Sequence, residues 1–278
     1  MFKGRKLLIA TKHHKEQVIA PIFEDKLGVQ CFVTDKFDTD ILGTFTGEIE
    51  RQEDALTTLK KKCLLAMKAN DCDLAIASEG SFGMHPSIFI AQADDEMMLL
   101  LDAKNNVEVI AREISTDTNL NASEITNTAD LMAFAEKVNF PSHGLILKAS
   151  QNNFETIYKG ITEKDDLLEK FHLVKEQFGS AYLETDMRAN FNPTRMKLIE
   201  KVAIILVQSV LNECPNCNFP GFSITKANTG LPCEWCHSPT QSTLSYTYEC
   251  KKCHYQKEDL YPHNKTKEDP MYCDFCNP

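Results

Sequence analysis

Four Cys-x-x-C pairs in the last quarter of the chain constrain its fold more than any other feature. Two residues between the sulfurs let one tight turn present both thiolates to the same ion, and two such turns supply the tetrahedral set of four sulfurs that zinc prefers. A segment this short buries little apolar surface, so bound metal would contribute much of its folding free energy, on the order of 10 kcal/mol per site. The candidate zinc ligands are Cys214, Cys217, Cys233, Cys236, Cys250, Cys253, Cys273 and Cys276.

The order in which the four pairs combine is open, because each connecting segment is long enough to form a hairpin. A sequential arrangement joins the first pair with the second and the third with the fourth, and we favour it. A nested arrangement joins the middle two pairs and the outer two. Iron also binds four-sulfur sites, and a single Cys-x-x-C can serve in redox chemistry, but four pairs in series favour two structural zinc ions.

The rest of the chain indicates a cytoplasmic protein. The apolar run after the basic N-terminus, Leu7 to Ala10, is too short for the core of a signal peptide. No stretch approaches the roughly 18 apolar residues that a membrane span requires. In a reducing compartment, paired cysteines are typical of metal ligands, not of disulfides.

The charge balance disfavours nucleic acid as a partner. The chain carries 40 acidic and 30 basic residues, for a net charge of −10. Residues 212–278 are also acidic, and zinc-bound thiolates would make them more so. Phosphate contacts would therefore lack their main driving force.

The apolar patterns divide the chain into an α/β domain, residues 1–211, and a double zinc-ribbon module, residues 212–278. Strand-like and helix-like segments alternate in the first part, which predicts a mixed sheet flanked by helices. Strands are expected at 7–10, 29–34, 73–77, 97–102, 107–114 and 144–149, and helices at 15–27, 53–69, 129–138, 165–178 and 193–211.

Polar clusters follow several of these elements, where α/β proteins place their sites. Lys12 and Lys15 lie in the turn after the first strand, where a helix N-terminus favours an anion. Asp38 and Asp40 lie in a polar loop, and two carboxylates one residue apart can share Mg²⁺. Each cluster can equally be a solvated surface segment.

The segment Ser78–Gly83 is expected to end the third strand in a glycine turn. It lacks the first glycine of a hydrolase elbow and the Gly-Lys-Ser/Thr ending of a P-loop. Glu79, which follows an apolar strand, is the best candidate for a catalytic or metal-binding carboxylate, and Ser81 is a candidate ligand-binding residue. The alternative is a structural turn with an exposed glutamate.

The segment before the last helix holds a third group of candidates. Asn192 is expected to cap that helix and Pro193 to begin it. Arg195 then lies in the first turn, where the helix dipole disfavours a cation, so it needs an anion nearby. Asp186 or Glu184 can supply that anion, or a bound phosphate or carboxylate can. Arg188 and Asp186 complete the candidate binding residues.

Three runs, together with the four Cys-x-x-C pairs, resemble a bacterial protein family of unknown function. They are Ile-Ala-Thr-Lys-His-His-Lys-Glu from Ile9, Ala-Ser-Glu-Gly-Ser-Phe-Gly from Ala77, and Thr-Asp-Met-Arg-Ala-Asn-Phe-Asn-Pro-Thr-Arg-Met from Thr185. The resemblance implies the same α/β domain and zinc-ribbon module. The family pattern has glycine where His14 stands and proline where Met84 stands.

The N-terminal part is more loosely similar to nucleotide pyrophosphatases of the inosine-triphosphatase type. The shared layout is a strand, a Lys-Glu pair opening a helix, an acidic loop, a Lys-rich helix and a strand ending in an acidic residue. The likeness implies Mg²⁺-assisted attack on a nucleoside triphosphate, with Lys15, Glu16 and Glu79 as catalytic residues.

Two hypotheses about function follow. The chain is a Mg-dependent enzyme acting on a nucleotide or another phosphate-containing small molecule, or it is a non-enzymatic binding or scaffold protein whose zinc-ribbon module docks a protein partner. Nucleic-acid binding is a weaker third hypothesis. The substrate and the oligomeric state are left open.

Overall fold

A computed structural model describes residues 1–37 and 53–278 of the chain. These residues form two compact units, Met1–Val207 and Gln208–Pro278. The first unit has the expected α/β architecture, with sheets flanked by helices, and the second carries all eight paired cysteines. No helix among the described residues combines the length and apolar character needed to cross a membrane.

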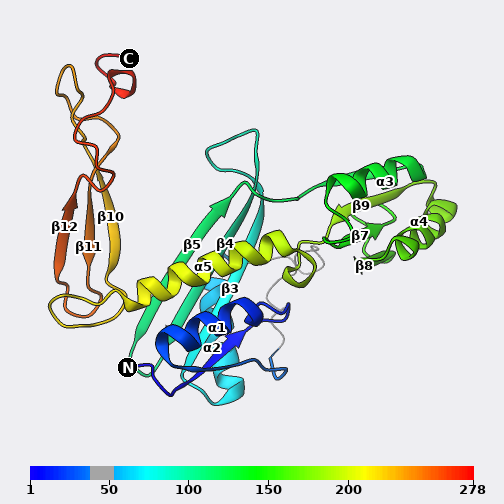
Figure 1. Cartoon of the computed structure of the whole chain (residues 1–278), viewed down its shortest axis with the longest axis horizontal. Helices are drawn as coiled ribbons and strands as arrows, with labels where there is room; N and C mark the ends of the chain where they lie inside the picture. The colour runs from blue at the N-terminus through cyan, green and yellow to red at the C-terminus, as the bar shows by residue number, and fades with distance from the viewer. Residues whose placement is uncertain (38–52) are drawn as a thin grey trace. The chain divides into compact units, whose positions relative to one another are not determined.

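A five-stranded mixed sheet forms the larger part of the first unit (Figure 1). Its strand order is β2-β1-β3-β4-β5, in which β1 lies parallel to β2 and β3 while β3, β4 and β5 are antiparallel. Two short parallel strands, β1 and β2, thus lie beside three longer antiparallel strands, β3 to β5. The strands are β1 (Lys6–Ala10), β2 (Gln30–Phe32), β3 (Leu74–Met84), β4 (Gln92–Asp102) and β5 (Val107–Ser115).

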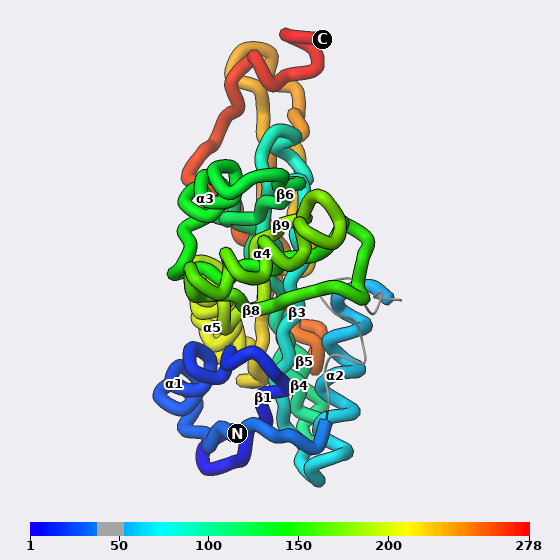
Figure 2. Tube along the Cα trace, turned by 90° about the vertical axis from the view of Figure 1, so that its right-hand side faces the viewer, coloured from blue at the N-terminus to red at the C-terminus, as the bar shows by residue number. Residues whose placement is uncertain are grey.

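Helices cover both faces of this sheet. Figure 2 shows α2 (Ala55–Asn70) on one face, and α1 (Glu16–Leu27) with α5 (Pro193–Leu211) on the other. The apolar stripe of α2, with Leu59 and Cys63 at helical spacing, packs on Ala75 and Ala77 of β3 and on neighbouring residues. Since side chains alternate along a strand, even-numbered residues of β3 face α1 and α5.

The caps of these helices follow from local sequence. Asp54 accepts a hydrogen bond from the backbone N–H of Thr57 and so caps α2. Gly28 ends α1 with a φ of 64°, a left-handed conformation that glycine adopts without steric cost. Pro21 lies inside α1, which nevertheless begins at Glu16. The predicted capping of α5 by Asn192 is confirmed, because its side chain accepts from the N–H of Arg195 at 3.0 Å.

The predicted glycine turn at Ser78–Gly83 is wrong. These residues continue β3 as far as Met84 and pair with Gln92–Met98 of β4. The glycine pattern suggested a turn, but backbone hydrogen bonds to β4 keep these residues extended, and the local sequence does not reveal that pairing. β3 therefore extends well past Ala10, where β1 ends, and this offset creates the setting of the polar site described below.

A second, four-stranded sheet completes the first unit. Its order is β6-β9-β7-β8, with all neighbours antiparallel. Two helices and the sheet share one apolar core built around Leu131, Leu147, Leu167 and Phe171. The elements are β6 (Ala122–Ile125), α3 (Thr128–Lys137), β7 (Leu145–Lys148), β8 (Ile157–Ile161), α4 (Lys164–Phe178) and β9 (Ala181–Thr185). The sequence patterns predicted β7 and both helices, but not the separate sheet.

The second unit is a three-stranded antiparallel sheet with Cys-x-x-C turns at both ends. The strands are β10 (Ser223–Thr229), β11 (Thr243–Glu249) and β12 (Gln256–Leu260), in the order β10-β11-β12. Each strand alternates direction with its neighbour, so each turn lies at the end opposite to the next turn along the chain.

Candidate functional site

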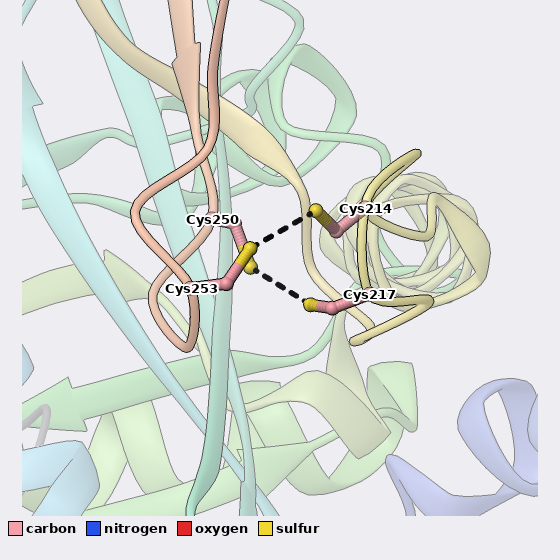
Figure 3. A group of neighbouring side chains, drawn as sticks. All are labelled: Cys214, Cys217, Cys250 and Cys253. Carbon is pink, nitrogen blue, oxygen red and sulfur yellow. Dashed lines mark hydrogen bonds between the residues drawn. The ribbon is translucent and has the colours of Figure 1, made fainter.

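The first four-cysteine set brings together the first and third pairs (Figure 3). The Sγ atoms of Cys214 and Cys253 lie 3.6 Å apart, as do those of Cys217 and Cys250. All four sulfurs lie within 4.8 Å of one another. A tetrahedron with zinc–sulfur bonds of about 2.3 Å has edges of about 3.8 Å, so the spacing fits a zinc ion.

The second set brings together the second and fourth pairs. The Sγ atoms of Cys236 and Cys273 are 3.5 Å apart, and those of Cys233 and Cys276 are 3.9 Å apart. The four sulfurs again lie within 4.8 Å of one another. Four thiolates without a carboxylate or imidazole form a closed, structural type of donor set. Both sets can therefore each hold a metal ion.

The favoured sequential pairing is wrong, and so is the nested alternative. A whole strand separates each pair from the next, and seven extended residues span roughly 23 Å, so consecutive pairs lie at opposite ends of the sheet. The antiparallel partner of Ser223 is Glu249, which returns Cys250 to the end where Cys214 lies. The pairs therefore alternate: first with third, and second with fourth.

All four turns use one backbone arrangement. In each pair, the residue after the second cysteine donates its N–H to the carbonyl of the first cysteine, at 2.8 to 3.1 Å; the donors are Asn218, His237, His254 and Asn277. The first three of these residues have left-handed φ angles of 55–62°. Two of these turn residues are histidines, and the eight cysteines suffice for both sets.

A cluster of buried charged side chains lies in the first unit where β3 runs past the end of β1. Lys15, at the start of α1, is buried and donates from Nζ to Ser78 Oγ at 2.8 Å. Because β1 ends at Ala10, the edge of β3 beyond Ala77 has no β1 neighbour, and the turn into α1 places Lys15 there. The predicted candidate Lys15 thus meets the predicted third-strand segment.

Arg195 joins the same face of the sheet from α5. Its Nε donates to Glu96 Oε1 at 2.6 Å, and both side chains are fully buried. A second guanidinium nitrogen donates to the carbonyl of Met187, and the ring of Phe82 lies 5.0 Å from the guanidinium carbon. The anion beside Arg195 is therefore Glu96, whereas the alternatives drawn from the sequence were Asp186, Glu184 or a bound phosphate or carboxylate.

Gly80 provides the room for this ion pair. Gly80 is the cross-strand partner of Glu96 in β4. A Cβ at position 80 would lie 2.2 Å from the Glu96 carboxylate and 2.5 Å from the Arg195 guanidinium. The glycine that suggested a turn is in fact a strand residue whose missing side chain accommodates two buried charges.

Glu79 lies on the opposite face of β3 and forms a buried ion pair with Lys62 of α2. Lys62 is one of three consecutive lysines, and the other two lie at least partly in solvent. The charges of Lys62 and Glu79 both act on the pKa of Lys15, as do those of Arg195 and Glu96. The two ion pairs and Lys15 therefore form one electrostatic cluster around the unpaired stretch of β3.

Burial shifts two groups of this cluster toward neutral pH. Burial lowers the pKa of Lys15 to about 8, and the nearby charge of Arg195 adds to the effect. Burial raises the pKa of Asp94 to about 8, reinforced by the negative charge of Glu96. Among the described residues, Asp94 Oδ1 and Glu96 Oε2 are buried without a hydrogen-bond partner. Such groups are typical of functional sites.

Replacing Asp94 by asparagine is expected to flatten the dependence of stability on pH. Between about pH 4 and pH 8 the unfolded carboxyl group is ionised, whereas the folded one keeps its proton. The folded state then binds more protons, so the free energy of unfolding falls as pH rises, by at most about 1.4 kcal/mol per unit. Urea unfolding from pH 5 to 8, followed by the helical circular dichroism signal, measures it. Equal slopes for both proteins would contradict the prediction.

Other predicted candidates lie outside the cluster. Lys12 is exposed, and Glu16 is half-buried beside His14; both line a groove of about 1160 Å³ along β2. His14 has a left-handed φ of 57°, the conformation that glycine favours. Ser81 is exposed on the α2 face of β3.

The remaining candidates form a separate contact or cannot be placed. Arg188 pairs with the buried Asp186 at 2.6 Å and lies over the ring of Phe191. Asp186 also accepts from the N–H of Gly160 in β8 and from that of Arg188, so it ties the segment before α5 to β8. Asp38 and Asp40, the proposed Mg²⁺ ligands, lie outside the described residues. Among the described residues, the only groups of three or more candidate metal ligands are the two cysteine sets.

Sequence reasoning missed Lys62, Asp94 and Glu96. A signal for the two acids was present, because Asp94, Glu96, Met98 and Leu100 alternate along one face of a strand. All four are buried. Lys62 had no such signal, since a lysine among lysines on an amphipathic helix is normally solvated.

The comparison with protein families matches the model described as a domain of unknown function, DUF6671, over residues 62–278. The matched region includes both cysteine sets and the cluster members Lys62, Glu79, Asp94, Glu96 and Arg195. No curated protein matches the chain.

Proposed function

The chain belongs to the DUF6671 family, whose function is unknown, and from its two kinds of site we propose that it binds two structural zinc ions and acts as an enzyme on a phosphate-containing small molecule. Four thiolates per set, in a spacing that fits a ZnS₄ tetrahedron, support zinc. The reducing cytoplasm is the compartment in which such thiolates stay available for metal.

The buried charged cluster supports the enzymatic part of the proposal. Lys15, Arg195, Asp94 and Glu96 lie on one face of the sheet and the Lys62–Glu79 pair lies on the other, and their charges act on one another within one electrostatic neighbourhood. A purely structural ion pair uses both of its partners. This cluster also includes one carboxyl oxygen each of Asp94 and Glu96 that has no hydrogen-bond partner among the described residues, and two groups with pKa values near 8. This convergence is the single observation that carries the proposal.

The cluster residues suit distinct roles toward a phosphate. Lys15, at the N-terminus of α1 and opposite the open edge of β3, would bind phosphate oxygens. Glu79, the catalytic carboxylate that the loose likeness to inosine triphosphatases implies, lies beside Lys62 on the other face of β3 and would orient water or a Mg²⁺ ion there. Arg195 holds Glu96 in place and so positions the acidic side of the site. A nucleotide is the substrate class that the loose likeness to inosine triphosphatases favours.

Ligand-induced thermal stabilisation tests this function. Melting temperatures are measured with a panel of nucleoside mono-, di- and triphosphates, with and without Mg²⁺. A ligand at 100 times its dissociation constant stabilises by about 2.7 kcal/mol, a shift of several degrees. Lys15→Met should abolish the shift, and Glu79→Gln should abolish or weaken it. Lys12→Met, which removes the same charge from an exposed position, should retain it. The absence of any shift across the panel would remove the basis for an enzyme acting on nucleotides.

Docking of a protein partner by the second unit is the other candidate function. One observation favours it: among the described residues the largest exposed aromatic side chains include Trp235 and Phe275, both of which lie inside Cys-x-x-C turns. The acidic balance of the second unit again disfavours nucleic acid.

A further inference from the structure

The second four-cysteine set carries an exposed aromatic residue in each of its two turns. The turns read Cys-Glu-Trp-Cys and Cys-Asp-Phe-Cys, so Trp235 and Phe275 occupy the same position, directly before the second cysteine. Each side chain is 74% exposed. Since Cys236 and Cys273 belong to one set, a single ion would fix both turns, and with them both aromatic residues.

Further apolar groups extend this surface. Met271 and Tyr272 are exposed in the short helical turn Pro270–Tyr272, which leads directly into Cys273. We call Trp235, Met271, Tyr272 and Phe275 the aromatic surface. Large apolar side chains gathered at one end of a small domain are typical of a binding site.

The first four-cysteine set shows that such residues are not needed to bind metal. Its turns hold Pro215 with Asn216 and Lys251 with Lys252. The nearby aromatic residues are instead used in packing: Phe222 is buried, and its ring stacks on Tyr248 with centroids 5.6 Å apart. The exposed residues of the second set therefore have no evident role in folding the unit.

Charge identifies the kind of partner. Glu234 and Asp274 precede the two aromatic residues and are exposed, as is Asp269. Four thiolates around one divalent ion add further negative charge at the same place. Lys265, a nearby cation, is paired with Glu268. An aromatic ring flanked by carboxylates attracts a lysine or arginine both by charge and through the ring face, whereas a nucleic-acid backbone would be repelled.

We propose that the aromatic surface docks a lysine- and arginine-rich segment of a partner protein. Basic side chains of that segment lie over Trp235 and Phe275 and form ion pairs with Glu234 and Asp274. The inference rests on the proposed zinc binding only in that the metal holds the two turns together. It is independent of the enzymatic function proposed for the first unit.

Intrinsic fluorescence provides a direct measurement, because Trp235 is the only tryptophan of the chain. The zinc-loaded full-length protein is titrated with a peptide that alternates lysine and arginine with glycine. We expect a saturable change in emission whose affinity weakens as salt rises. A glutamate–glycine peptide of the same length and a uridine oligonucleotide should give no saturable change. A flat titration with the basic peptide, or equal binding of the oligonucleotide, would overturn the proposal.

Variants then separate the aromatic contribution from the acidic one. Phe275→Ala removes a ring without changing charge, and Asp274→Asn removes a charge without changing the ring. Each should weaken peptide affinity by at least about fivefold. Lys252→Ala, in the first cysteine set, should bind the basic peptide at least as tightly as the unaltered protein. Zinc content is measured for every variant. A Phe275→Ala or Asp274→Asn variant that keeps two ions and binds the basic peptide with unchanged affinity contradicts the docking surface. Fewer than two ions in the unaltered protein contradict the zinc proposal.

Discussion

Replacing Cys214 and Cys250 together by serine is expected to remove one of two zinc ions, whereas replacing Cys214 and Cys273 together removes both. The first two cysteines belong to one set, so the second substitution falls on a site already lost. The other combination damages one ligand in each set. Each lost site should cost on the order of 10 kcal/mol of the free energy that folds the second unit. Metal content by elemental analysis, after dialysis against a weak chelator, measures the result.

The same two variants discriminate among all three arrangements of the four pairs. Under sequential pairing both variants lose both ions, because neither Cys250 nor Cys273 would then share a site with Cys214. Under nested pairing Cys214→Ser with Cys273→Ser loses one ion and the other variant loses two. A single substitution of Cys63, which is buried in the core of the first unit and belongs to neither cysteine set, should leave two ions bound and serves as the control.

The two four-cysteine sets are built from cysteines that the sequence already marks as candidate metal ligands, but their pairing could not be predicted. Ligand identity is local, since two residues between cysteines suffice to define a turn that binds metal. Pairing depends on how many strands separate the turns. Segment 223–229 lacks a strong strand pattern, and only its pairing with residues 243–249 shows that the first and third turns meet at one end. The sequence therefore predicts a cysteine-rich metal-binding module, whereas the pairing of its turns follows only from the strand order of the sheet.

The charged cluster shows the same limit at longer range. Lys15, Glu79 and Arg195 stood out because each follows or begins a predicted element. Their partners lie elsewhere in the chain: Glu96 is 99 residues from Arg195. The register of β3 on β4 places Glu96 beside Gly80, and nothing local to either residue indicates that register. Sequence reasoning thus found three charges of the cluster, and the sheet supplied the rest.

Replacing Arg195 by methionine is expected to destabilise the first unit by about 3–5 kcal/mol. The substitution leaves the carboxylate of Glu96 buried with neither its ion pair nor solvent, which is the costly way to break a buried pair. For a unit of about 200 residues, 1 kcal/mol corresponds to roughly 2–4 °C, so the melting temperature should fall by roughly 6–20 °C. Differential scanning calorimetry of the zinc-loaded protein measures this shift.

Two comparisons make the result specific to the buried pair. Lys201 lies on the same helix and pairs with Glu113 of β5, but its side chain is 59% exposed, so Lys201→Met should cost less than about 1 kcal/mol. The double variant Arg195→Met with Glu96→Leu removes both charges and should recover most of the lost stability, because apolar side chains of similar size can replace a buried pair at little cost. If Arg195→Met costs no more than Lys201→Met, the pair is not isolated from solvent. If the double variant is as unstable as the single one, the cost comes from packing and not from an uncompensated carboxylate.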